Sequence, residues 1–410
     1  MLAVNIIFIE PAFPVNQREF VRGLAAAGAT VIGIGERPVD HLDADLKDWM
    51  LHYQQIGNVT DVGALVDAVR FAQGKVWIDA LESTVEAHTM AAAQAREACG
   101  IPGTSVRTAY LCRDKPSMKE ALRSVGIATA QSTAASSSAE VRAFAASVGY
   151  PLILKPRAAA GASGTVRVDS DAELDRELSA LGASGASDVA LEEFVEGHEG
   201  FYDTISIGGR PAYDFISHYY PNVLEAMRER WISPQFISTN RVDTAADYEQ
   251  VRDLGLRAIE ALGIGTSATH MEWFFGPKGL RFSEIGCRPP GVRAWDLYAA
   301  GNDVDIYREW ANAIVHGATD RPLSRRLAAG IVALRPDQDG TIQRYEGLES
   351  VQRQFGEWVL DTHLPDAGTP TQPVEAGYMA NAWVRMVHPD YDTLRHMLNV
   401  VGETVHVRAS

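Results

Sequence analysis

The sequence predicts an α/β protein that is divided into more than one domain. Three observations support this: a length of 410 residues, alternating strand-like and helix-like segments at the start, and hairpin-like strand patterns after residue 150. A single core rarely serves so long a chain, so two or three domains are expected. The composition, 46% hydrophobic and 22% charged, is ordinary for a globular chain.

The first hundred residues carry the alternation. Apolar residues at 4–9 and β-branched residues at 30–34 predict strands, and helical spacing at 17–27 and 62–71 predicts helices. A further strand is expected at 76–78. Alternating strands and helices favour a parallel sheet covered by helices. No Gly-x-Gly-x-x-Gly follows the first strand, which argues against a dinucleotide site there.

Charge and cysteine content limit the function classes. The net charge of −16 and the pI near 5.1 disfavour nucleic acid and anionic membrane surfaces as partners. The three cysteines, Cys99, Cys112 and Cys287, predict neither a disulfide framework nor a zinc site and fit a reducing compartment.

The N-terminus lacks a basic lead, and no apolar run reaches about 18 residues. A cytoplasmic protein is therefore expected.

The first segment of chemical interest begins with an apolar strand that is followed by a lysine. Lys155 follows the strand at 152–154, small residues fill 158–164, and a second strand follows at 165–168. Small side chains let backbone N–H groups approach phosphate oxygens, and the lysine adds positive charge. No Gly-Lys-Ser/Thr follows, so this is not the Walker pattern. A flexible hairpin with a surface lysine explains these residues equally well. Just before it, the serine-rich stretch 132–138 is expected to be a loop and a helix N-cap.

A predicted β-hairpin further along brings two carboxylates together. Apolar strands flank residues 277–279, which are expected to form a three-residue turn. That turn pairs Gly276 with Leu280 and so places Glu272 directly opposite Glu284. Facing carboxylates repel each other, and Mg²⁺, which prefers oxygen ligands, would offset the repulsion.

Side-chain alternation along this hairpin predicts one shared face, made of His270, Glu272, Glu284, Gly286 and Arg288. The competing interpretation is that Arg288 or Arg281 neutralises the carboxylates without a metal. His270 is expected to be a packed or hydrogen-bonded residue rather than a ligand. Cys287 alternates to the opposite face and is expected in the core.

The acidic run 191–199 alone predicts only a solvated charged face. In this order, however, the lysine strand, the acidic run and the carboxylate hairpin resemble the ATP-grasp superfamily, from about Arg113 to His316. The resemblance implies an α/β ATP-grasp fold. Its implied parts are a Rossmann-like N-terminal domain (1–112), an ATP-grasp domain (113–320, with a lid at about 126–200 and a central part at 201–320) and a small C-terminal α/β subdomain (321–410).

The resemblance also implies a nucleotide site. Lys115 and Lys155 would contact phosphates, and the loop around 160–165 would cover them. Glu192 would accept from the adenine amino group, with backbone contacts from its neighbours, and Glu199 would hold the ribose. The implied nucleotide-binding residues are Lys115, Lys155, Ala160, Gly161, Ser163, Gly164, Glu192, Glu193, Val195 and Glu199.

The metal pair and the arginine also have family counterparts. Glu272 and Glu284 match the carboxylates that bridge phosphates through magnesium, and Arg288 matches an arginine that stabilises the acyl phosphate and the tetrahedral intermediate. Many members carry an asparagine where this chain has Gly286, which leaves a second metal site open. L-amino-acid ligases are similar in lacking that asparagine, in the Thr-His-x-Glu run at 269–272 and in the Arg-x-x-Gly at 288–291.

The function implied is an ATP- and Mg²⁺-dependent carboxylate–amine ligase of the EC 6.3 type, with Lys155 and Arg288 as its catalytic residues. It would form an amide bond through an acyl phosphate, release ADP and phosphate, and join two amino acids. Other ATP-grasp chemistry, such as a carboxylase or a purine-pathway ligase, and a non-catalytic nucleotide-binding regulator are the alternatives. Residues 217–231, Arg293 and Trp295 are open candidates for substrate contacts. A homodimer remains open, because dimers are common among such proteins.

Overall fold

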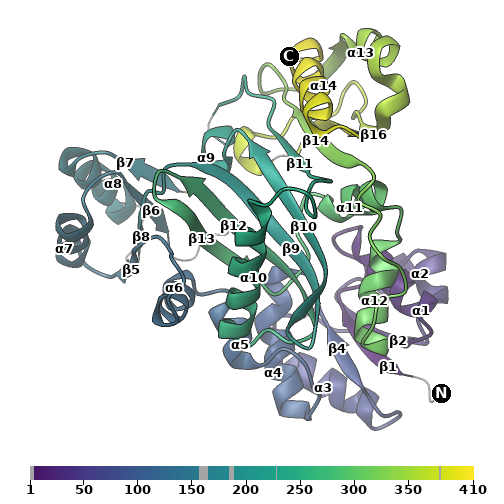
Figure 1. Cartoon of the computed structure of the whole chain (residues 1–410). Coiled ribbons are helices and arrows are strands. Elements are labelled where there is room, and N and C mark those ends of the chain that lie inside the picture. Colours follow the sequence, from purple (N-terminus) through teal and green to yellow (C-terminus); the bar gives the residue numbers. More distant parts are fainter. Residues whose placement is uncertain (1–3, 157–164, 184–188, 228, 378–379) are drawn as a thin grey trace.

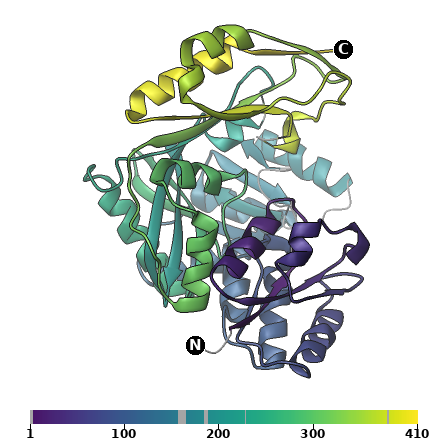
Figure 2. The same cartoon turned by 90° about the vertical axis from the view of Figure 1, so that its right-hand side faces the viewer.

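The computed structural model describes residues 4–156, 165–183, 189–227, 229–377 and 380–410. Its strands form a four-stranded sheet near the N-terminus, an eight-stranded central sheet, a second four-stranded sheet and a strand pair. Figure 1 shows the central sheet in the middle, with the second four-stranded sheet at one side and the N-terminal sheet at the other. Figure 2 shows the C-terminal and N-terminal parts at opposite ends of the molecule.

The N-terminal sheet is parallel, in the order β3-β2-β1-β4, as the alternating pattern predicts. Its strands are β1 (Asn5–Ile9), β2 (Thr30–Gly35), β3 (His52–Gln55) and β4 (Ala80–Glu82). The main helices of this part are α1 (Gln17–Ala26), α3 (Val62–Gln73), α4 (Thr89–Cys99) and α5 (Val106–Leu111).

The strand predicted at 76–78 is wrong. The Val76 N–H donates to the Ala72 carbonyl at 3.0 Å, so Val76 is part of the turn that follows α3. The chain joins the sheet only where the Asp79 N–H donates to Asn5. Trp77 is 77% exposed, so its side chain does not pack against a face of the sheet.

The central sheet is antiparallel, in the order β13-β12-β9-β10-β11-β14-β17-β16. Its strands are β9 (His198–Ile207), β10 (Arg210–Tyr220), β11 (Gln235–Ser238), β12 (Ser267–Gly276), β13 (Gly279–Gly286), β14 (Ala328–Leu334), β16 (Val359–His363) and β17 (Ala382–His388). Helix α10 (Tyr248–Leu262) packs on one face, and α11 (Ala294–Asn302) and α12 (Ile306–His316) pack on the other.

The C-terminal part adds β14, β16 and β17 to the central sheet, and its other two strands form a separate two-stranded sheet. Around them lie α13 (Leu348–Phe355), α14 (Tyr391–Thr404) and the antiparallel pair β15 (Ile342–Glu346) and β18 (His406–Ala409). In the described part of the chain, no helix has both the length and the apolar character needed to cross a membrane.

We call the second four-stranded sheet and its two helices the lid. It contains β5 (Ser132–Ala135), β6 (Leu152–Pro156), β7 (Val166–Val168), β8 (Val189–Glu193), α7 (Ser138–Val148) and α8 (Asp171–Ala183), with strand order β5-β8-β6-β7. The buried apolar cluster of the lid, which includes Leu152, Leu154 and Leu191, shares no member with the three clusters around the central sheet. The lid therefore has a core of its own.

The serine-rich stretch before α7 is only partly what its composition predicts. Ser137 caps α7 in a capping box with Glu140, as expected of a serine there. Residues 132–135, however, form strand β5 and not a loop, because their backbone pairs with β8. Pairing with a neighbouring strand overrides the weak strand propensity of serine and alanine.

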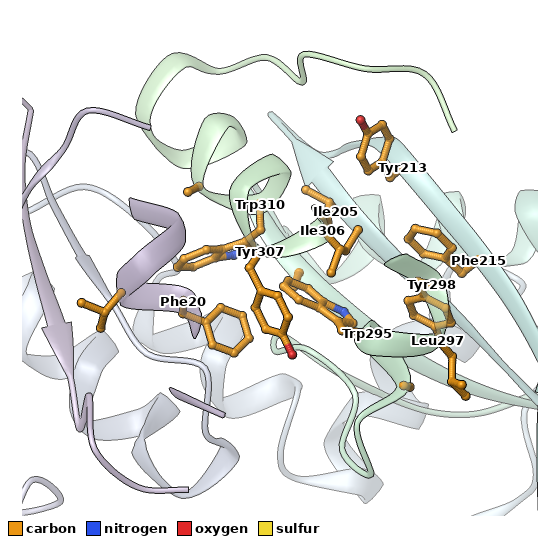
Figure 3. Close-up of a cluster of buried hydrophobic side chains, with 14 of the residues drawn as sticks. Phe20, Ile205, Tyr213, Phe215, Trp295, Leu297, Tyr298, Ile306, Tyr307 and Trp310 are labelled. Atoms are coloured by element: carbon orange, nitrogen blue, oxygen red, sulfur yellow. The ribbon is translucent and has the colours of Figure 1, made fainter. Parts of the chain in front are cut away.

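An aromatic cluster joins the N-terminal part to the central sheet (Figure 3). The ring of Phe20 on α1 lies 5.0 Å from the rings of Trp295 and Tyr307 and 5.1 Å from that of Trp310. Buried aromatic side chains contribute much of the apolar area in a core, and the pairs of Phe20 with Tyr307 and Trp310 add edge-to-face contacts. Trp295, an open candidate for substrate contact, is therefore a core residue.

Candidate active site

A cavity of about 450 Å³ lies between the lid and the central sheet. Its walls come from the start of α6 (Lys115–Ser124), lid strands β6 and β8, central strands β9, β12 and β13, residues 222–225 and Glu229. Among the residues lining it are five of the predicted charged residues: Lys115, Lys155, Glu192, Glu272 and Glu284. Glu193, Val195 and Glu199 also line it. The structure thus brings these sequence candidates together.

Glu272 of β12 pairs directly with Glu284 of β13, as the sequence predicts. The predicted three-residue turn is nevertheless wrong: Gly276 pairs with Gly279, so the turn has two residues. A bulge between Glu272 and Trp273 then shifts the register by one residue and restores the facing carboxylates. The bulge therefore offsets the one-residue change in register that the shorter turn causes.

Lys115 supplies the counter-charge for this pair. Its ammonium donates a short hydrogen bond to Oε2 of Glu284. Burial opposes ionisation of Glu284, but Lys115 outweighs it and lowers the pKa of that carboxyl to about 2. Neither of the two arginines considered from the sequence, Arg281 and Arg288, forms the ion pair with Glu284 in the described structure. Asp114 caps α6 by accepting from Ser117, which holds Lys115 in the first turn of that helix.

Glu192 lies between two lysines. Oε1 accepts a short hydrogen bond from Lys119, and Oε2 lies 3.4 Å from the ammonium of Lys155. Burial raises the pKa of Glu192, but the two lysines lower it more strongly, to about 2. Both oxygens are thus engaged, so an adenine amino group would have to share one of them.

Lys119 is not among the site residues that the sequence predicts. Its side chain is 1% exposed, and burial lowers its pKa. Lys119 lies four residues after Lys115, so both lysines lie on one face of α6. This spacing could have indicated that Lys119 faces the site. Its partner on the lid lies 73 residues away, and no local pattern reveals that contact.

Glu199 is a buried carboxyl on β9. Its Oε2 accepts from the Val223 N–H at 2.7 Å, and its own N–H donates to Asn222 at 3.0 Å. Burial is the main cause that raises the pKa of Glu199, and repulsion from Glu272 is the second; the pKa is about 8. A neutral carboxyl both donates and accepts hydrogen bonds, which suits a hydroxyl-bearing ligand.

His270 is hydrogen-bonded, as expected. Its Nδ1 lies 2.6 Å from Oδ1 of Asp203, and Oδ2 of Asp203 accepts from the Tyr298 hydroxyl. The Nε2 of His270 lies 3.7 Å from Glu272. Burial lowers the pKa of His270, but Asp203 raises it further, to about 9. A protonated imidazole is a poor metal ligand and places positive charge beside Glu272.

The residues predicted at the adenine differ in availability. The Glu193 N–H already donates to the Gln131 carbonyl at 2.8 Å, and the Glu193 side chain forms a short bond with Lys278 in the hairpin turn. Among the described residues, the Val195 backbone makes no hydrogen bond, so both of its groups are available to a ligand. Ala160, Gly161, Ser163 and Gly164 lie outside the described residues.

Arg288 lines a second cavity, of about 630 Å³, between the N-terminal part and the segment after β13. Its Nε and Nη2 donate to Oε2 of Glu86 at 3.0 and 2.8 Å. Arg288 lies only four residues beyond Glu284, and its charge opposes protonation of His270. The second cavity is thus near the first, although Arg288 itself does not line the first.

The two facing carboxylates of the cavity fit a hard cation that takes its other ligands from a bound substrate and water. Within the described ranges, no group of three or more His, Cys, Asp or Glu side chains could hold a metal ion. Glu272 and Glu284 provide carboxylate oxygens on one wall of the cavity. Mg²⁺ is commonly held by one or two carboxylates together with substrate phosphates and water, so these residues fit that ion when a phosphate is present.

Comparison with known proteins now identifies the domain. The ATP-grasp domain family matches residues 120–300. This is an ATP-grasp domain protein. The match includes Lys155, Glu192, Glu272, Glu284 and Arg288, and the predicted ATP-grasp fold is confirmed.

The ATP-grasp domain protein has relatives over most of its length. It is 24% identical over 369 residues to the L-arginine-specific L-amino acid ligase of Bacillus subtilis, which covers 88% of this chain and 87% of that protein. The crystal structure of an L-amino acid ligase from Bacillus licheniformis superposes with a TM-score of 0.76 at 18% identity and 99% coverage of both chains.

A further relative is matched over part of its length. The uncharacterized protein y4rH of Sinorhizobium fredii is 26% identical over 258 residues, which are 61% of this chain and 51% of that protein. The chain thus spans about half of that relative. The resemblance to L-amino-acid ligases stated from the motifs is confirmed at the level of sequence and fold.

Proposed function

We propose that this protein is an ATP-dependent carboxylate–amine ligase that joins two amino acids through an acyl phosphate and releases ADP and phosphate. The observation that carries the proposal is the arrangement of Glu272 opposite Glu284 in one cavity with Lys115 and Lys155. Paired carboxylates with paired lysines suit a polyphosphate with bound magnesium.

The nucleotide would lie in the cavity under the lid. Lys115 and Lys155 would bind phosphate oxygens, the Val195 backbone would face the adenine, and Glu199 would bind the ribose hydroxyls. Glu272 and Glu284 would hold Mg²⁺, which neutralises phosphate charge when bound. Because Lys115 now bonds Glu284, it would exchange that contact for a phosphate when the nucleotide enters.

The first chemical step is attack of a substrate carboxylate on the γ-phosphate. The oxygen–phosphorus bond forms as the bond to ADP breaks, and the lysines stabilise the negative charge on the transferred group. An acyl phosphate results, and an amine then attacks its carbonyl carbon to release phosphate.

We assign Arg288 to the second step. It lies in the neighbouring cavity, held by Glu86, four residues beyond Glu284. A guanidinium there would stabilise the oxyanion of the tetrahedral intermediate once the ion pair with Glu86 opens. No serine or cysteine nucleophile is required.

Amino acids are the substrate class that the motifs and relatives support. The B. subtilis relative is an L-arginine-specific L-amino acid ligase, and Gly286 replaces the asparagine of many other ATP-grasp branches. A carboxylase of the biotin type would normally carry that asparagine. A regulator that only binds nucleotide would need no oxyanion arginine such as Arg288.

Phosphate release from ATP and Mg²⁺, screened over single amino acids and pairs, tests the proposal. A pair that triggers release and gives a condensation product of the matching mass supports ligation and names both substrates. ATP binding without release across all single and paired amino acids, bicarbonate included, would contradict it and favour the non-catalytic alternative. Release with bicarbonate alone would instead indicate a carboxylase.

A further inference from the structure

Two cysteines that are distant in sequence meet behind the candidate active site. The Sγ atoms of Cys112 and Cys287 lie 2.9 Å apart, although 175 residues separate them along the chain. The side chains are 4% and 6% exposed and belong to the same apolar cluster. The sequence predicts Cys287 in the core, as observed, but does not predict its contact with Cys112.

Both cysteines stand at the ends of secondary structure. Cys112 is the C-cap of α5, and Cys287 follows the last residue of β13. A disulfide needs its sulfurs about 2.05 Å apart, so closure requires a relative shift of less than ~1 Å. Residues at element ends adapt to such a shift more readily than residues inside a helix or strand.

The pair also links two parts of the candidate site. Lys115 follows Cys112 by three residues, and Glu284 precedes Cys287 by three. Lys115 and Glu284 are themselves joined by a hydrogen bond. A bond between the cysteines would therefore run beside that contact and hold the same two segments together.

We propose that Cys112 and Cys287 are a redox-active pair that closes to an intramolecular disulfide. The oxidant is a peroxide. One thiolate attacks a peroxide oxygen and becomes a sulfenic acid, and the hydroxide released takes up the thiol proton as water. The second thiol then displaces the sulfenic oxygen, which leaves as a second water, and one S–S bond has formed at the cost of one hydrogen peroxide.

The environment of the pair sets its rate. The hydrogen bond to Cys112 and burial raise the pKa of the Cys287 thiol, and the charge of Arg96 opposes this. Little Cys287 thiolate is therefore present at neutral pH, so attack by Cys287 is slow there and faster at higher pH.

Oxidation of the full chain with hydrogen peroxide tests the pair directly. The protein is treated at pH 7 and pH 8.5, blocked with iodoacetamide without reductant, digested and analysed by mass spectrometry. The expected result is a peptide linking Cys112 to Cys287, formed faster at pH 8.5 and released by dithiothreitol. Recovery of both residues as alkylated thiols, or their linkage to Cys99, would overturn the proposal.

Matched variants extend the test to stability. Cys99→Ser removes the third cysteine, which lies outside the apolar cluster of the pair, and should leave the linked peptide unchanged. Peroxide should raise the Tm of the wild type and of Cys99→Ser by about 5 °C, because the bond closes a long loop. Cys287→Ser should lose that rise. The mapping uses no substrate, so its outcome is independent of the proposed ligase activity.

Discussion

The buried ammonium of Lys119 on α6 donates a hydrogen bond to Glu192 on lid strand β8. Lys155 lies on the other side of the same carboxylate, at 3.4 Å. Because Lys119 neutralises Glu192, Lys155 can turn toward a phosphate without leaving a buried negative charge unpaired. Under the proposed function, Lys119 would therefore position Lys155 for a phosphate.

Replacement of Lys119 by methionine tests this relationship. Glu192 would then depend on Lys155 alone and hold it away from the nucleotide, so the Kd for ATP should rise about tenfold, or ~1.4 kcal/mol. The Tm should also fall. The double variant Lys119→Met/Glu192→Gln should recover most of the Tm, since it removes both charges. Isothermal titration and thermal unfolding measure the two effects, and an unchanged ATP affinity in the single variant would refute the role.

Loss of one metal-side carboxylate should stop turnover but not folding. Glu284→Gln keeps the shape of the side chain and removes its charge, so phosphate release should fall at least ~100-fold. A purely structural carboxylate pair would instead be relieved by this change. Glu260→Gln, an exposed glutamate on α10, is the matched control and should retain activity. Full activity of Glu284→Gln would remove the metal assignment.

Glu199 should make stability depend on pH. Burial and Glu272 raise its pKa from 4.5 to about 8, so the folded protein binds a proton that the unfolded chain releases between these values. Its contribution to the free energy of unfolding is present below about pH 4.5 and is lost as the pH rises to about 8.

The variant Glu199→Gln removes that titration. Its Tm relative to wild type should increase by a few degrees between pH 5 and pH 8 and then level off. Gln can still accept from the Val223 N–H, so the local contact is kept. Thermal unfolding over pH 5–9 measures the difference, and parallel curves for the two proteins would disprove the titration.

Arg288 and Lys155 should separate chemistry from nucleotide binding. Arg288→Met should lower kcat ~100-fold or more and leave the Kd for ADP unchanged, because Arg288 lies outside the nucleotide cavity. Lys155→Ala should weaken ADP binding, and Arg288→Lys should recover part of kcat. An Arg288→Met protein with wild-type kcat would exclude the oxyanion role.

The fold was largely predictable because periodicity and ordered motifs act locally. The N-terminal parallel sheet follows from alternating apolar segments, and the facing carboxylates follow from the hairpin pattern. The turn length was wrong because Gly279 supports either a two-residue or a three-residue turn. Only the bulge at Trp273 restores the predicted pairing, and a bulge depends on neighbouring strands, which one hairpin sequence does not reveal.

The remaining site features depend on contacts between distant segments. The bond from Lys119 to Glu192, the pair of Arg288 with Glu86, and the meeting of Cys112 with Cys287 each join residues at least 73 positions apart. Sequence patterns predict which residue types are chemically able to act. They do not predict which partner neutralises a given charge, because tertiary packing decides that.

The separate core of the lid affects how nucleotides would enter and leave. Ion pairs, Lys119 with Glu192 and Lys278 with Glu193, cross from the lid to α6 and to the hairpin turn. A swing of the lid would break these charged contacts and leave each apolar core covered. Salt screens the more exposed pair, Lys278 with Glu193, most strongly. Ionic strength should therefore control how often the lid opens, and product release should accelerate as salt is added.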